Sequence, residues 1–106
     1  MAVARRWLAA LGRWQVAPAP APAAELRALS TPALQRALLL PGLTREPIAP
    51  SFGSPPSAGR TVALRAYLDP SGWTVIATRQ FGRDVLAVEL ILVRTRGGPR
   101  VSSYEP

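Results

Sequence analysis

The sequence predicts a small α+β protein in which helix covers an antiparallel sheet of three or four strands. From about residue 60 to residue 104, apolar and polar side chains alternate with a period of two, and short turn sequences interrupt the pattern. Before residue 60 the apolar side chains follow helical spacing, and two proline-rich stretches divide that part of the chain. A chain of 106 residues has room for one such domain.

Three turn sequences divide the C-terminal half into a meander. They are "DPSG" at 69–72, "GRD" at 82–84 and "RGGP" at 96–99. They separate the predicted strands "RTVALRAYLD" (60–69), "WTVIATRQF" (73–81) and "VLAVELILVRT" (85–95), and "RVSSY" (100–104) follows as a short edge strand. Strands joined by such short turns run antiparallel.

The third predicted strand is apolar on both faces. One face carries Leu86, Val88, Leu90 and Leu92, and the other carries Val85, Ala87, Ile91 and Val93. A strand of this kind needs cover on both faces. We therefore expect either the N-terminal segment or another protein chain to cover the second face. Glu89 interrupts the run, and we expect it to pair with Arg79 or Arg65 on a neighbouring strand.

Residues 25–43 form a helical segment. Thr31 is suited to cap a helix whose first residue is Pro32, and "PG" at 41–42 ends it, so a short helix is predicted over about 32–40. Residues 25–30 then form a turn or a kinked preceding helix. The short helix is expected to pack on one face of the meander at 60–106.

Two proline-rich arms flank this helical segment. Residues 17–24, "APAPAPAA", favour an extended polyproline-type spacer and exclude a helix interior. Residues 44–59, "TREPIAPSFGSPPSAG", predict a loop that serves as a contact arm or moves freely.

Residues 1–16 predict a basic amphipathic helix. At helical spacing Val3, Trp7, Leu11 and Trp14 form one stripe, and Arg5, Arg6 and Arg13 lie opposite it. Tryptophan and arginine are enriched at interface hot spots, so the favoured interpretation is a helix that docks on a partner protein. The proposed contact residues are Trp7, Leu11, Trp14, Arg5, Arg6 and Arg13.

Other interpretations of this helix remain open from the sequence. It could cover its own sheet, lie weakly on a membrane surface, or act as a secretory or mitochondrial targeting segment. The apolar run "WLAALG" is interrupted by Arg13, which disfavours a secretory signal, and the shortness of the stripe disfavours firm membrane binding. The compartment stays unknown, with a cytoplasmic location favoured.

The composition argues against catalysis. The formal net charge is +7, and histidine and cysteine are absent, as is lysine. The six acidic residues show no spacing that suggests a shared site, and no glycine-rich loop precedes a helix. We therefore expect a protein that is not an enzyme, with no metal and no cofactor, and no small-molecule substrate is evident.

A second candidate function is association with nucleic acid. Arginines concentrate in the C-terminal third, and those in or near turns could contact phosphates: Arg83, Arg94, Arg96 and Arg100. A basic surface also attracts anionic lipid or acidic proteins, so charge alone does not choose between them.

One family resemblance bears on residues 54–98, "SPPSAGRTVALRAYLDPSGWTVIATRQFGRDVLAVELILVRTRGG". With "GR" before an arginine-bearing strand and an arginine-containing tail, this stretch resembles the last three strands of the RelE/ParE toxin family. The resemblance implies a toxin-like enzyme as a further alternative. The family's opening strand and helical hairpin are not matched, and no functional residue is carried over.

The residues together favour a non-catalytic accessory or adaptor subunit. It would dock into a larger protein assembly through the helix at 1–16 and the two proline-rich arms. Nucleic acid is the leading alternative partner, and a membrane surface follows it.

Overall fold

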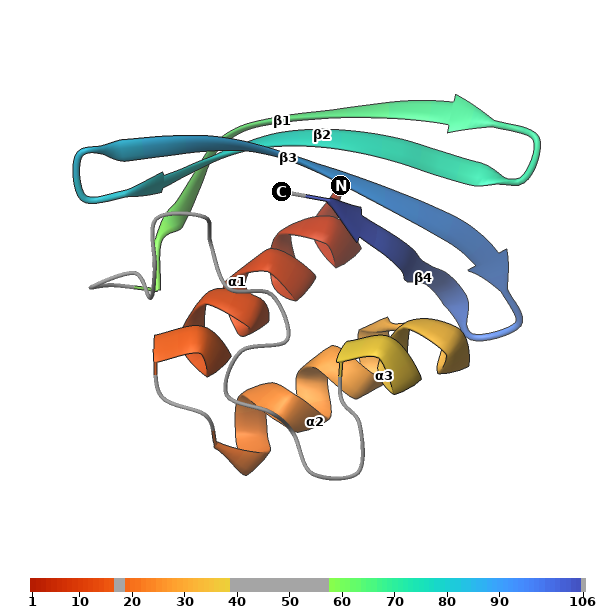
Figure 1. Ribbon diagram of the computed structural model, residues 1–106. Coiled ribbons are helices and arrows are strands. Elements are labelled where there is room, and N and C mark those ends of the chain that lie inside the picture. Colours follow the sequence, from red (N-terminus) through yellow and green to blue (C-terminus); the bar gives the residue numbers. More distant parts are fainter. Residues whose placement is uncertain (17–18, 39–57, 106) are drawn as a thin grey trace.

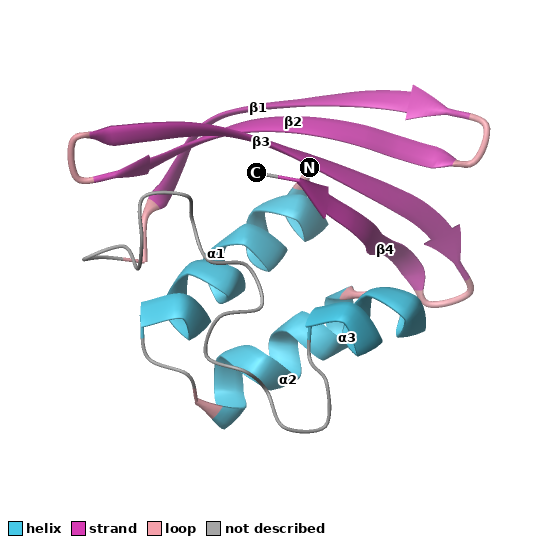
Figure 2. Ribbon diagram, in the orientation of Figure 1, coloured by secondary structure: helices cyan, strands magenta, loops and turns pink. Residues whose placement is uncertain are grey.

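The helices and the sheet form two layers (Figure 1, Figure 2). The computed structural model describes residues 1–16, 19–38 and 58–105. The sheet contains β1 (Arg60–Asp69), β2 (Gly72–Phe81), β3 (Asp84–Thr95) and β4 (Gly98–Glu105), in the order β1-β2-β3-β4 and antiparallel throughout. The helices α1 (Ala2–Val16), α2 (Pro20–Leu29) and α3 (Pro32–Leu38) lie on one side of it. The predicted α+β class and antiparallel meander are confirmed.

Tight turns set the strand register at the three predicted positions. In the first turn the Asp69 carboxylate accepts hydrogen bonds from the backbone N–H groups of Ser71 (2.8 Å) and Gly72 (2.9 Å). In the second turn Gly82 has a φ of 63°, a conformation that costs glycine little. The register that follows places Asp69 opposite Gly72, and Phe81 opposite Asp84.

The two faces of the sheet differ in their cover. The inner face, turned toward the helices, carries the buried side chains of Val75, Ala77, Val88, Leu90, Leu92 and Val101. α1 crosses this face and contacts both edge strands. α2 packs against α1, and α3 lies beside β4. The helix that mainly covers the inner face is therefore α1, whereas that role was predicted for the helix at 32–40.

α2 corrects the prediction of an extended spacer over 17–24. Residues 20–24 are helical, with Pro20 at the first position of α2 and a buried Pro22 one turn or less from its start. The N–H groups of the first helical turn have no partner within the helix, so proline costs little there. Residues 25–30, predicted as a separate turn or kinked helix, continue α2 to Leu29.

α3 begins where the sequence predicts. Thr31 caps it, since its hydroxyl oxygen accepts a hydrogen bond from the Leu34 N–H (3.3 Å) and its carbonyl accepts one from the Gln35 N–H (2.9 Å). The predicted end of this helix at residue 40 and the predicted loop, as far as residue 57, lie outside the described residues.

The predicted ion pair of Glu89 is not formed. Arg79 points to the inner face, where it is buried, whereas Glu89 lies on the outer face of β3. Arg65 shares a row with Glu89, but Ile76 stands between them, and Glu105 is the β4 neighbour of Glu89. Among the described residues the two ion pairs both belong to Glu25. The turn at 82–84 places Phe81 opposite Asp84, and alternation from that pair puts Arg79 and Glu89 on opposite faces.

The two edges of the sheet differ in their backbone pairing. At β4, the junction between α2 and α3 adds a parallel bridge from Ser30 to Val101, and the Thr31 N–H donates to the Val101 carbonyl oxygen (2.9 Å). β1 forms the opposite edge, and no described strand or bridge pairs with its outer side.

Gly12 allows the helical layer to approach the chain before β1. A Cβ at this position would overlap the carbonyl oxygen of Ala58 and meet the guanidinium of Arg79. An alanine usually stabilises a helix interior by about 1 kcal/mol relative to glycine. Here we expect Gly12→Ala to lower the free energy of unfolding by about 1–3 kcal/mol, because the neighbouring backbone must move.

Urea denaturation monitored by tryptophan fluorescence measures this effect. The control is Ala24→Gly on the exposed side of α2, where only helix propensity is at stake and the loss should be about 1 kcal/mol. A gain of stability in Gly12→Ala would contradict the packing argument.

Candidate functional site

The apolar stripe of α1 lies in the protein's own core. Trp7 and Trp14 have no exposed surface and Leu11 is 4% exposed, and Val3 packs at the edge of the same cluster. The sequence left a choice between a partner and the chain's own sheet, and these three predicted contact residues are buried within the chain. Because Trp7, Leu11 and Trp14 are buried, they are not exposed for contact with a membrane surface.

Trp7 joins three parts of the fold. Its indole Nε1 donates a hydrogen bond to the Ser30 hydroxyl oxygen at the end of α2 (2.8 Å), and its ring lies 5.3 Å from that of Tyr104 on β4. Burial raises the pKa of Tyr104 above its usual value. The Trp14 Nε1 is buried and has no hydrogen-bond partner among the described residues.

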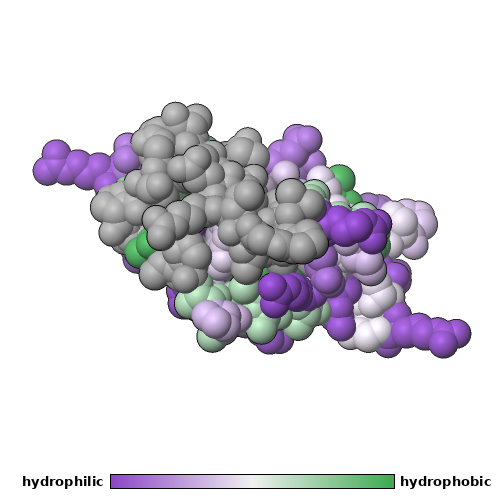
Figure 3. Space-filling model, turned by 60° about the horizontal axis from the view of Figure 1, so that its bottom comes forward, coloured by the Kyte–Doolittle hydropathy of each residue, from purple (hydrophilic) through white to green (hydrophobic). Residues whose placement is uncertain are grey.

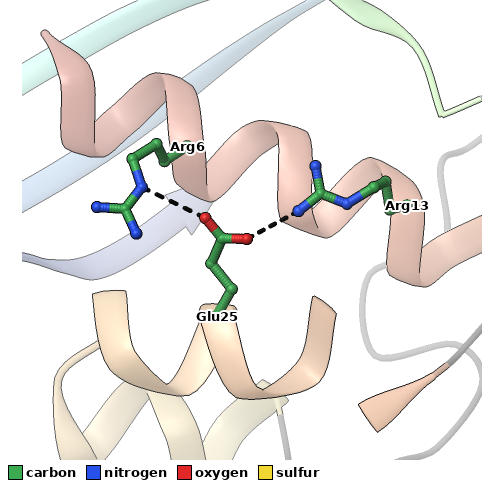
Figure 4. A network of polar contacts seen from close by, with 3 residues as sticks. All are labelled: Arg6, Arg13 and Glu25. Carbon is green, nitrogen blue, oxygen red and sulfur yellow. Dashed lines mark hydrogen bonds and ion pairs between the residues drawn. The ribbon is translucent and has the colours of Figure 1, made fainter. Parts of the chain in front are cut away.

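The arginines of α1 are exposed, as predicted, but two of them have a partner within the chain. Arg6 and Arg13 lie on either side of Glu25, which projects from α2 (Figure 4). The distances are 3.3 Å from Arg6 Nε and 2.8 Å from Arg13 Nη2 to the two carboxylate oxygens. Such exposed pairs contribute about 0–1 kcal/mol each, so the arginines remain able to exchange Glu25 for another anion. Arg5 is also exposed.

Arg79, on the inner face of β2, connects α1 to the sheet through hydrogen bonds. It is only 4% exposed, and its guanidinium donates to the carbonyl oxygens of Leu8 (3.3 Å) and Ala58 (2.9 Å) and to the Thr61 hydroxyl (2.9 Å). Burial lowers its pKa, although the nearby Tyr104 acts in the opposite direction. This role was not predicted, because a period-two strand pattern does not distinguish a core arginine from a solvated one.

The four arginines proposed for nucleic acid divide between the two ends of the sheet. Arg83 lies in the β2–β3 turn, while Arg94, Arg96 and Arg100 lie at or beside the β3–β4 turn. Seen from the helical side, strongly hydrophilic side chains project at opposite ends of the molecule (Figure 3). The structure therefore places three of the four at one end of the sheet, with Arg94 on the inner face and Arg100 on the outer face.

This three-arginine end also carries an aromatic ring and one carboxylate. The Arg94 guanidinium lies over the Trp73 ring at 4.8 Å, and Arg100 donates to the carbonyl oxygens of Gly97 and Pro99 (3.2 Å each). Hydrogen bonds from Ser71, with smaller contributions from Gly72 and Arg94, lower the pKa of Asp69. A cation over an indole keeps much of its charge available to solvent or to a ligand.

No described helix covers the outer face of the sheet (Figure 1). The strand register places side chains in rows across it, one of which holds Tyr67, Thr74, Ile91 and Ser103, and the next Arg65, Ile76, Glu89 and Glu105. Tyr67, Ile76, Val85 and Ile91 are exposed there. This is the second apolar face of β3 that the sequence singled out, and the described N-terminal helices do not cover it.

Side chains suited to catalysis or metal binding do not gather in the described part of the chain. No group of three or more acidic, histidine or cysteine side chains could hold a metal ion there. No described helix is long and apolar enough to cross a membrane.

Comparison with known proteins gives no relative. No protein-family model, no curated protein and no solved structure matches this chain. The resemblance to the RelE/ParE family stays a prediction from the residues at 54–98.

The attachment of α1 by Arg79 leads to a stability prediction. Arg79→Lys should lower the free energy of unfolding by about 1–3 kcal/mol, because an ammonium on a shorter side chain cannot span the acceptors that the guanidinium reaches with Nη1 and Nη2, and buried oxygens are left unpaired. The control is Arg94→Lys, which keeps a cation over Trp73 on the exposed surface and should change stability by less than about 0.5 kcal/mol. Chemical denaturation of both variants measures the difference, and equal losses would refute the special role of Arg79.

Proposed function

We propose that this protein is a non-catalytic accessory subunit that docks onto a partner protein through the outer face of its sheet. The observation that carries the proposal is the exposed apolar group that Tyr67, Ile76 and Ile91 form in two adjacent rows of that face. Apolar side chains that lie together on a surface are typical of protein interaction sites. Burial of Trp7 and Trp14 moves the proposed docking surface from α1 to the sheet.

The charges on the outer face define the partner further. Glu89 and Glu105 are direct neighbours on β3 and β4, with Ile76 on the other side of Glu89. Like charges placed opposite one another in a sheet are unfavourable unless a cation lies near them. A partner with an apolar patch and an arginine or lysine at its rim would bury Ile76 and Ile91 and balance the two carboxylates.

Site-specific photo-crosslinking tests this proposal. A photo-crosslinking amino acid in place of Ile91, in the living source cells, should yield one dominant protein adduct. The same amino acid in place of Arg36, exposed on α3, should not. With the purified partner, Ile76→Lys should weaken binding about tenfold or more in calorimetry, since it places a cation in the apolar centre of the contact.

Glu105→Lys probes the charge argument in the same assay. This single substitution should also weaken binding, whereas Arg36→Glu on the helical side should leave the affinity unchanged. Equal crosslinking from positions 91 and 36, or full affinity in Ile76→Lys, would overturn the assignment of the outer face.

Association with nucleic acid is the second candidate, favoured by the presence of Arg94, Arg96 and Arg100 at one end of the sheet, where Arg94 lies over Trp73. Phosphates could bind these arginines while a base stacks near the indole. Alanine at all three positions should remove most binding of a short labelled RNA in fluorescence anisotropy. The wild-type affinity should fall steeply between about 50 and 200 mM salt.

A charge-matched variant controls for the net charge of the chain. It replaces three exposed arginines of the helical layer with alanine: Arg5, Arg27 and Arg36. If both triple variants lose the same affinity, attraction is diffuse and the three-arginine end is not a site. Absence of binding at low salt would exclude the function altogether.

A further inference from the structure

The β1 edge of the sheet is a second surface that the described residues leave unpaired. The β4 edge is occupied at Val101 by the bridge from Ser30, whereas β1 presents ten residues with no described partner on its outer side. Natural proteins usually protect an edge strand with proline, bulges or short length. β1 has one irregularity, between Thr61 and Ala63, and residues 63–69 pair regularly with β2.

The side chains of this regular stretch are unusually exposed for apolar groups. Tyr67 is 54% exposed and Leu68 is 67% exposed, although their alternation places them on opposite faces of the sheet. No contact on one face alone could therefore cover both. A strand added beside β1 would lie next to the two faces at once.

We propose that β1 pairs antiparallel with β1 of a second copy of this chain, centred on Ala66, so that the two sheets become one continuous sheet. This goes beyond the docking function proposed above, and it uses the β1 edge, which shares only Tyr67 with the exposed apolar group of the outer face. A two-fold axis perpendicular to the sheet keeps the helices of both copies on the same side and closes the contact. Small, exposed Ala66 then lies on the axis, opposite Ala66 of the second copy.

The side chains select this register. Residues paired across an antiparallel ladder must share a face, so the centre falls on a residue rather than between two. Centring on Arg65 would oppose two arginines, and centring on Tyr67 would pair a shorter stretch that runs into Pro70. Centring on Ala66 uses the whole of residues 63–69.

In this register every large side chain of the stretch gains a complementary neighbour. Arg65 lies opposite Tyr67 of the second copy on the outer face, which suits a cation and an aromatic ring. Leu64 lies opposite Leu68 of the second copy on the inner face. Each pair occurs twice, so the contact covers both exposed groups, Tyr67 and Leu68.

Charge substitutions at position 67 test the register. Tyr67→Arg places like charges opposite each other twice and should weaken dimerisation on the order of tenfold in sedimentation equilibrium. Tyr67→Glu places opposite charges there and should leave the dimer as strong or stronger. Arg65→Glu combined with Tyr67→Arg should restore the dimer. The matched controls are Val85→Arg and Val85→Glu, exposed on β3, which should have no effect.

Position-specific crosslinking gives an independent measurement, because the chain contains no cysteine. Ala66→Cys brings two thiols together at the axis, and a short bismaleimide should link them. Ala63→Cys on the same strand is the control, since its two thiols would be about 20 Å apart in this register. Circular dichroism confirms that each variant is folded.

A monomer at all concentrations would overturn the proposal. So would a dimer that responds equally to Tyr67→Arg and Tyr67→Glu, or equal crosslinking from positions 63 and 66. Ile76→Lys, the docking variant, should leave this dimer intact, so failure of one proposal is distinguishable from failure of the other.

Discussion

The packing of Trp7 is the interaction on which the remainder of the structure depends. This side chain projects from α1 into the protein core, where its Nε1–H donates a hydrogen bond to the Ser30 hydroxyl and its ring contacts that of Tyr104. Ser30 is also the residue that bridges to Val101, so the indole connects the first helix, the end of the second and the last strand. A chain this small has few core residues, and a side chain of this size determines which face of the sheet is covered.

The sheet was predictable because its determinants are local. Turn chemistry at residues 69–72, 82–84 and 96–99, together with alternation between the turns, specifies an antiparallel meander without knowledge of distant contacts. The capping role of Thr31 was predictable for the same reason, since a cap involves residues within one turn of it. The helical state of residues 20–24 was missed, because alternating alanine and proline suits an extended segment and also the first turn of a helix.

The candidate site was harder to predict because it depends on which side of each element faces the core. The amphipathic stripe of α1 has the same pattern whether it covers its own sheet or a partner, and only the tertiary packing decides. The predicted pairing of Glu89 with Arg79 was wrong for a related reason, since strand alternation places Arg79 on the opposite face. The two-sided apolar character of β3 was visible in the sequence, and it did indicate the face that the described helices leave exposed.

The closure of one sheet edge and not the other has a consequence for assembly size. A sheet that is open at both edges can add copies without limit, which is the route to fibres. Here the bridge between Ser30 and Val101 interrupts the outer side of β4, so the direction left for strand addition along a whole edge is β1. Any association through β1 uses up that direction in both copies and stops. The short junction between α2 and α3 would therefore limit assembly through β1 to two copies, because it interrupts strand pairing at β4.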